Sequence, residues 1–163
     1  MKRTALTALL FSGVMLWTAP ILAIDLFTGC RISATDVVFG SYVPFNVSES
    51  IGSVSLSCGS LITLVSNSIS YEVKLSSGGS SPLARKMSKG NDKLGYNLYM
   101  DSSYNTFWGE TTPNTHIGKF KYSGLLGVIV VMSEDFSVHG RIPAGQFVSA
   151  GNYSDLVTVT VMY

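Results

Sequence analysis

Apolar and polar residues alternate in short runs along most of this chain, which is the two-residue period of half-buried β-strands. Residues 53–58 alternate serine with an apolar side chain, and residues 70–75 alternate Ser70, Glu72 and Lys74 with apolar side chains. The same pattern predicts further strands at residues 24–32, 37–42, 94–100 and 136–142. Stretches rich in Gly, Ser, Asn, Asp and Pro separate these runs. No helical period survives beyond the N-terminal segment, so we predict an all-β chain folded as a sandwich.

The segment 156–163 is the most β-prone part of the chain. One face of this strand carries Val157, Val159, Val161 and Tyr163, and the other carries Thr158 and Thr160. Neither a turn nor a partner strand follows it in the sequence. Because an unpaired sheet edge favours pairing with other chains, we expect this edge to receive a strand from another polypeptide. The four residues of the first face are then the predicted wall of an acceptor groove, which a chaperone would also bind.

Residues 125–132 form a nearly continuous apolar run. A run of this length is too short to span a membrane. It fits a strand that is buried on both faces, which is what we predict here.

The N-terminus has the features of a secretory signal peptide. Lys2 and Arg3 precede an apolar run over residues 5–17, and Ala23 is a small residue suited to the cleavage position. We predict a signal peptide over residues 1–23 and one domain over residues 24–163. The alternative is a membrane anchor, but the apolar run is shorter than the roughly 20 residues that a spanning helix needs, so we expect no anchor in the mature chain.

The charge and the cysteine content limit the class of protein and its possible partners. Charged residues make up 13% of the sequence and the net charge is +1, so nucleic acid is not an expected partner. The chain has two cysteines, Cys30 and Cys58. In an exported protein an even pair predicts one disulfide, worth roughly 3–4 kcal/mol in the chain-entropy description.

Residues that could carry catalysis or bind a metal are sparse. His116 and His139 are the only histidines, and zinc normally requires three or four ligands. Asp101 and Glu110 flank an aromatic stretch, but a glycosidase needs two carboxylates placed across a cleft. We therefore expect no catalytic residues, no metal and no cofactor, and do not expect an enzyme.

The aromatic stretch offers the best surface contact. Tyr104, Phe107 and Trp108 lie in an irregular segment between predicted strands. Exposed aromatic rings could stack on sugars or adhere to apolar surfaces. The competing interpretation is that Trp108 packs the end of the sandwich.

Several motifs along the chain occur in an order that resembles one family. They are Cys30, the segment 39–42, Cys58, the segment 71–78, Arg85 with Met87, and the segments 94–101, 108–109, 139–146 and 151–155. Together they resemble the spore coat protein U family, which includes the pilins of archaic chaperone–usher pili.

The resemblance implies an incomplete immunoglobulin-like sandwich that lacks its last strand. A periplasmic chaperone would lend that strand, and the N-terminal extension of another pilin subunit would replace it at an outer-membrane usher. The chain would pass through the periplasm to a cell-surface pilus and serve adhesion and biofilm formation. Strand addition is also physically favourable, because the added strand makes main-chain hydrogen bonds along the open edge and places alternate side chains in pockets.

The predicted donor strand is short. If cleavage follows Ala23, only residues 24–29 precede the first cysteine, and Ile24, Leu26 and Phe27 are its apolar members. An earlier cleavage site, a subunit at the tip or end of the fibre that acts as an adhesin, and a secreted or spore-coat relative that does not polymerise each explain this length. The sequence leaves these alternatives open.

Overall fold

The computed structural model describes residues 29–62, 66–81 and 84–163, and all of their regular structure is β. The strands are β1 (Gly29–Thr35), β2 (Ser48–Leu61), β3 (Ser66–Leu75), β4 (Arg85–Lys89), β5 (Asp92–Tyr99), β6 (His116–Ser123), β7 (Ile129–Ile142) and β8 (Val159–Met162). Within these described ranges, no helix has the length and apolar character needed to cross a bilayer.

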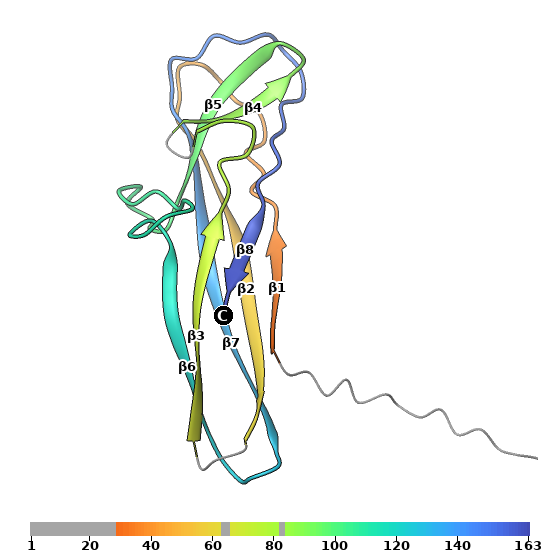
Figure 1. Cartoon of the computed structure of the whole chain (residues 1–163). Helices are drawn as coiled ribbons and strands as arrows, with labels where there is room; N and C mark the ends of the chain where they lie inside the picture. Colours follow the sequence, from red (N-terminus) through yellow and green to blue (C-terminus); the bar gives the residue numbers. More distant parts are fainter. Residues whose placement is uncertain (1–28, 63–65, 82–83) are drawn as a thin grey trace, which may run out of the picture.

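Two antiparallel sheets make up the molecule. One has five strands in the order β1-β2-β7-β5-β4, and the other has three in the order β6-β3-β8. Long strands of both sheets run along the length of the molecule, while β4 and β5 gather at one end (Figure 1). The predicted all-β sandwich is confirmed.

The alternating pattern explains how the layers meet. On β2, Val54, Leu56 and Cys58 point into the core, where Tyr71 and Val73 of β3 face them from the other sheet. Ser55 and Ser57 take the outer face of β2 and bond across to β7, with the Ser57 and Ser133 hydroxyl oxygens 2.6 Å apart. The apolar face of β2 is therefore buried in the core, and its polar face makes hydrogen bonds to β7. A shift of one residue would exchange the two faces, so this arrangement fixes the register.

The predicted disulfide between Cys30 and Cys58 is confirmed. The two cysteines are directly opposite each other in the β1–β2 pairing. Since β1 is an edge strand of the five-stranded sheet, this bond fastens the edge to the interior.

The strand predicted over residues 37–42 is wrong. Val37 and Phe39 are half-buried and alternate with exposed neighbours as a strand would, but the segment joins no sheet. It crosses over the inner face of the five-stranded sheet, where a Cβ on Gly52 or Gly140 would collide with it. Ser50 Oγ donates to the carbonyl oxygen of Val38 at 2.8 Å in place of a ladder bond.

The buried strand predicted over residues 125–132 is also wrong. A turn occupies residues 124–127 and β7 begins only at Ile129. Leu125 and Leu126 are 80% and 64% exposed in the loop that connects β6 of one sheet to β7 of the other. The apolar run is a surface feature because it lies in the connection from β6 to β7, at the end of the molecule opposite β4 and β5 (Figure 1).

Other differences concern element boundaries. The predicted strand at 24–32 is found as β1 (Gly29–Thr35), and residues 24–28 lie outside the described part of the chain. Strands β4 and β6 were not predicted, although β6 alternates Lys119 and Lys121 with Phe120 and Tyr122. The other predicted strands correspond to β2, β3, β5, β7 and β8.

Candidate functional site: an open groove between the sheet edges

Two strands present free edges on the same side of the sandwich. Among the described strands, β8 pairs only with β3, and β1 pairs only with β2. The two strands lie side by side from opposite sheets (Figure 1) and approach each other without pairing. Their backbone hydrogen-bonding groups on the facing edges are available to an added strand.

A groove of about 940 Å³ opens beside these edges. One wall is formed by residues 34–44, which follow β1, and the other by residues 148–157 together with Val159 of β8. The floor consists of core side chains from both sheets, namely Val54, Leu75, Leu94, Leu98, Val138 and Ile142. The interior of the sandwich is therefore reached directly from this side.

The predicted wall residues fall into two groups. Val157 and Val159 line the groove, and together with Val161 they are half-buried against the core. Tyr163 is 67% exposed. Its hydroxyl lies 3.5 Å from where a Cβ on Gly29 would be, so its side chain reaches across from β8 toward the start of β1. Thr158 and Thr160 point outward, as their alternation predicts.

The second wall was not foreseen from the sequence. Val37 and Phe39 contribute to it from the segment predicted to be a strand, and Val148 and Tyr153 face them from the other side. The only signal in the sequence was the apolar character of residues 37–39, which gives neither the buried face nor the crossing path. The predicted donor residues Ile24, Leu26 and Phe27 lie outside the described residues.

One polar cluster borders the otherwise apolar groove. Tyr96 Oη donates a hydrogen bond to the Asp155 carboxylate at 2.9 Å. Burial, this hydrogen bond and the negative charge of Asp155 all raise the pKa of Tyr96, so its hydroxyl stays protonated. Asp155 also accepts from the Gly79 amide at 3.2 Å. The cluster fixes the strand-like segment before β8 to the rest of the fold.

The histidines do not form a site with each other. His116 packs between Trp108 and Phe136, with ring centroids 4.4 Å and 4.5 Å away. Burial lowers the pKa of His116, which favours the neutral ring. His139 lies on the outer face of β7 near Tyr104. In the described ranges, no three His, Cys, Asp or Glu side chains are grouped as metal ligands would be.

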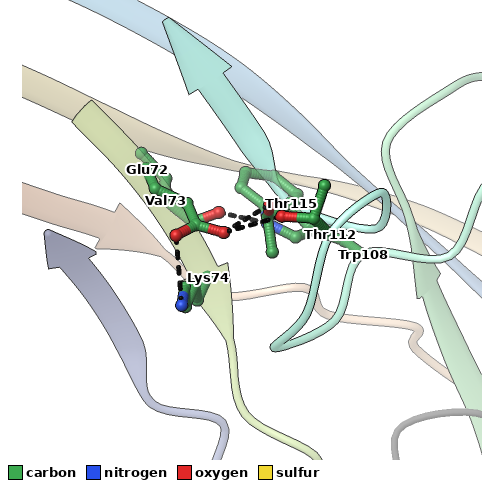
Figure 2. A network of polar contacts seen from close by, with 6 residues as sticks. All are labelled: Glu72, Val73, Lys74, Trp108, Thr112 and Thr115. Atoms are coloured by element: carbon green, nitrogen blue, oxygen red, sulfur yellow. Dashed lines mark hydrogen bonds and ion pairs between the residues drawn. The ribbon is translucent and has the colours of Figure 1, made fainter. Parts of the chain in front are cut away.

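Trp108 does not make a surface contact. The side chain is 0% exposed, and its Nε1 donates to the Val73 carbonyl at 3.1 Å. The competing interpretation, that it packs the interior, is the one that the structure shows. Figure 2 shows Trp108 behind the loop that carries Thr112 and Thr115, whose hydroxyls donate to Glu72. Tyr104 and Phe107 are half-buried on the outer face of the five-stranded sheet.

Comparison with known proteins gives three results. Residues 18–160 match the family model of the Spore Coat Protein U domain. Protein U of Myxococcus xanthus is 31% identical over 137 residues, which is 77% of this chain and 70% of that protein.

The third result is structural. One chain of the CsuC–CsuE chaperone–tip adhesion subunit pre-assembly complex, from the archaic chaperone–usher Csu pili of Acinetobacter baumannii, matches with a TM-score of 0.51 and 27% identity. The match covers 82% of this chain and 39% of that chain, so this protein spans about two fifths of the structural relative.

Proposed function

The chain belongs to the Spore Coat Protein U domain family, and on that premise we propose that it is a structural subunit of a chaperone–usher surface pilus. The observation that carries this proposal is the groove of about 940 Å³ that leads to the core beside the unpaired edge of β8. A donated strand would add main-chain hydrogen bonds along that edge and place alternate apolar side chains over the floor. The role is structural rather than enzymatic.

The proposed partners follow from what an open groove needs. Without a strand, the apolar floor and the free edge favour aggregation. A periplasmic chaperone would therefore supply a strand first, and another pilin subunit would replace it at an outer-membrane usher. The structural relative is itself named as a chaperone–subunit pre-assembly complex. Val157, Val159, Val161 and Tyr163 would contact the incoming strand, and Ile24, Leu26 and Phe27 would be donated to the next subunit.

A pair of substitutions on β8 tests the groove. Val159 faces the groove, whereas Thr160 next to it is exposed and lies opposite Lys74 of β3. Val159→Glu would place a charge where the donor's apolar side chains pack, and Thr160→Glu would add the same charge to the outer face. Co-expressed with a cognate chaperone in the periplasm, the V159E chain should lose the complex and the T160E chain should retain it.

Two results would contradict the proposal. One is a soluble, folded monomer of the wild-type chain in the absence of any partner strand. The other is equal complex formation by the two variants, which would show that the β8 groove face is not where the partner binds.

A second candidate is a tip or end subunit that adheres to a surface. The observation that favours it is the uncharged apolar tip formed by the β6–β7 connection, where Leu125 and Leu126 are among the most exposed apolar residues. The structural relative comes from a complex of a chaperone with a tip adhesion subunit. In this role the apolar tip, rather than Trp108, would contact an apolar surface.

Deleting residues 24–28 separates the two roles. A subunit within the shaft needs its donor segment and should fail to incorporate, while a subunit at the distal end should not be affected. Leu125→Ser with Leu126→Ser should reduce attachment of intact fibres to an apolar surface if the tip is adhesive, and should leave attachment unchanged if the chain is a shaft subunit. A secreted relative that does not polymerise would form no fibre in either experiment.

A further inference from the structure

A second hollow, of about 420 Å³, lies on the outer face of the five-stranded sheet. Side chains that border it include Val47, Lys86, Tyr99, Phe107, Arg141 and Pro143. Tyr99 pairs across the sheet with His139, and both alternate with the inward-facing Leu98 and Val138. The hollow is therefore separated from the strand groove by the thickness of the sheet.

An aromatic ledge bounds one end of this hollow. The rings of Tyr99 and Phe107 stack with centroids 4.9 Å apart, and Tyr104 meets the Tyr99 ring edge-on at 5.3 Å. Tyr104 has a φ of 56°, a left-handed conformation that is strained for a bulky residue. Strain of this kind persists only where the surroundings enforce it, and it concentrates at functional sites.

Asp101 provides that enforcement. Its carboxylate accepts hydrogen bonds from the backbone amides of Ser103, Asn105 and Thr106, at 3.0, 3.2 and 2.7 Å. These bonds lower the pKa of Asp101, so the carboxylate is ionised and the loop stays anchored at neutral pH. The ledge is thus formed before any ligand arrives, which reduces the ordering cost of binding.

Basic side chains lie at the border of the hollow and beneath it. The Arg141 guanidinium lies 5.0 Å from the centre of the Tyr104 ring and 3.5 Å from a Glu49 oxygen, and Lys86 is exposed at the border. Arg85 is fully buried beneath. The hydrogen bonds of Arg85 to carbonyl oxygens leave its charge in place, and Asp155 and Glu110 offset part of it from other sides. Because Glu49 offsets part of the Arg141 charge, the excess positive charge at the hollow comes from the exposed Lys86 and the buried Arg85.

Aromatic ring faces beside fixed cations suit a ligand that combines a ring with an anionic group. We propose that this hollow binds an acidic sugar unit of a surface polysaccharide, with the sugar carboxylate reached by Lys86 and Arg141 and the sugar ring lying against Phe107. The site would be present on every copy of the chain. It does not depend on strand exchange, because it lies on the opposite face of the sheet.

The experiment measures binding of fluorescently labelled trigalacturonic acid to the exported full-length chain, by fluorescence polarisation, in whichever form the chain is isolated. Competitors are unlabelled trigalacturonic acid and its methyl ester, which has the same rings without the charge. The variant is Lys86→Met, at an exposed position where folding should not suffer, and the matched control is Lys121→Met, on the exposed face of β6 in the other sheet. Phe107→Leu tests the ledge.

We expect the acid to compete at least about tenfold better than the ester, which corresponds to the loss of one charge-assisted hydrogen bond. Lys86→Met and Phe107→Leu should each weaken binding about tenfold, and Lys121→Met should leave it unchanged. Three outcomes would overturn the proposal: no measurable binding, equal competition by acid and ester, or equal losses for the two lysine variants, since the last indicates attraction by overall charge. None of these outcomes bears on the strand groove, so the two proposals fail separately.

Discussion

Arg85 shows how far a single residue can depart from what its type suggests. The side chain is 0% exposed, and its guanidinium donates to the carbonyl oxygens of Leu75, Ser76 and Trp108 and to the Asn97 side chain. Burial lowers the pKa of Arg85. A sequence pattern does not reveal this, because the bonded groups come from three distant segments and meet only in the folded chain.

Replacing Arg85 should therefore cost more than replacing its neighbour. Arg85→Met leaves several buried carbonyl oxygens without donors, and we expect a loss of about 2–5 kcal/mol in the free energy of unfolding. Lys86→Met alters an exposed side chain and should change it by less than about 0.5 kcal/mol. Urea unfolding of both variants measures the difference, and similar midpoints for the two would refute the structural role of Arg85.

Glu72 predicts a dependence of stability on pH. It accepts from Thr115 Oγ1 at 2.8 Å and lies 3.1 Å from Lys74 Nζ (Figure 2), and these contacts lower the pKa of its carboxyl, the Thr115 bond most. A carboxyl whose pKa is lower in the folded state stabilises the fold above its unfolded pKa, and that stabilisation is lost as pH falls through the folded pKa.

The measurement is the melting temperature from pH 7 down to pH 2. The wild-type chain should lose more stability over the acidic end than Glu72→Gln does, because the variant has no carboxyl to protonate at this position. Glu110→Gln, at an exposed position in the loop that carries Thr112 and Thr115, serves as the control and should follow the wild type. Parallel curves for wild type and E72Q would show that the Glu72 contacts do not contribute.

At the scale of elements, the alternation in the sequence predicted which face of a strand is buried better than it predicted where a segment runs in the fold. Val37 and Phe39 pack inward as alternate residues of a strand would, but a strand needs a neighbour with free backbone groups, and this segment instead crosses a sheet at two glycines. The buried strand predicted over residues 125–132 was wrong for a different reason. Burial depends on what covers a segment, and Leu125 and Leu126 are exposed in the loop that connects the two sheets.

Gly52 is the position where that crossing can be tested. A Cβ at Gly52 would lie 2.8 Å from the Thr35 backbone oxygen and 2.8 Å from Val37 Cγ2, so an alanine must push the segment away from β2. We expect Gly52→Ala to cost about 1–3 kcal/mol and to speed amide exchange in residues 36–44. Gly124→Ala, where the nearest atom is 4.0 Å away, is the control. Unchanged exchange in G52A would mean that the crossing is not held at this glycine.

At the scale of the whole molecule, the sequence indicated part of one wall of the cavity and nothing of the other wall. The face of the last strand followed from its alternation, and Val157 and Val159 do line the cavity. The opposite wall and the depth of the floor depend on how two sheets are offset, and no local pattern carries that information. The outer-face hollow was missed for the same reason, since Lys86 and Arg141 lie far apart in the sequence and are brought together by the β4–β5 and β5–β7 pairings.

The disulfide couples stability to the groove. The Cys30–Cys58 bond closes a separation of 28 residues and holds β1, the strand that borders the groove opposite β8. Replacing both cysteines by alanine, or reducing the wild type, should lower the free energy of unfolding by roughly 3–4 kcal/mol. Because β1 would then be anchored by backbone pairing alone, we also expect less complex with a strand-donating chaperone.

Two comparisons separate the effect of the disulfide on stability from its effect on strand capture. A reductant should destabilise the wild-type chain and leave Cys30→Ala with Cys58→Ala unchanged, which excludes a general effect of the reagent. Complex yield should be compared at a temperature where both forms are folded, because only then does a lower yield report on the edge strand. If the reduced chain is less stable but captures a strand equally well, β1 is held in place by β2 without the disulfide, and the bond contributes to folding rather than to the shape of the groove.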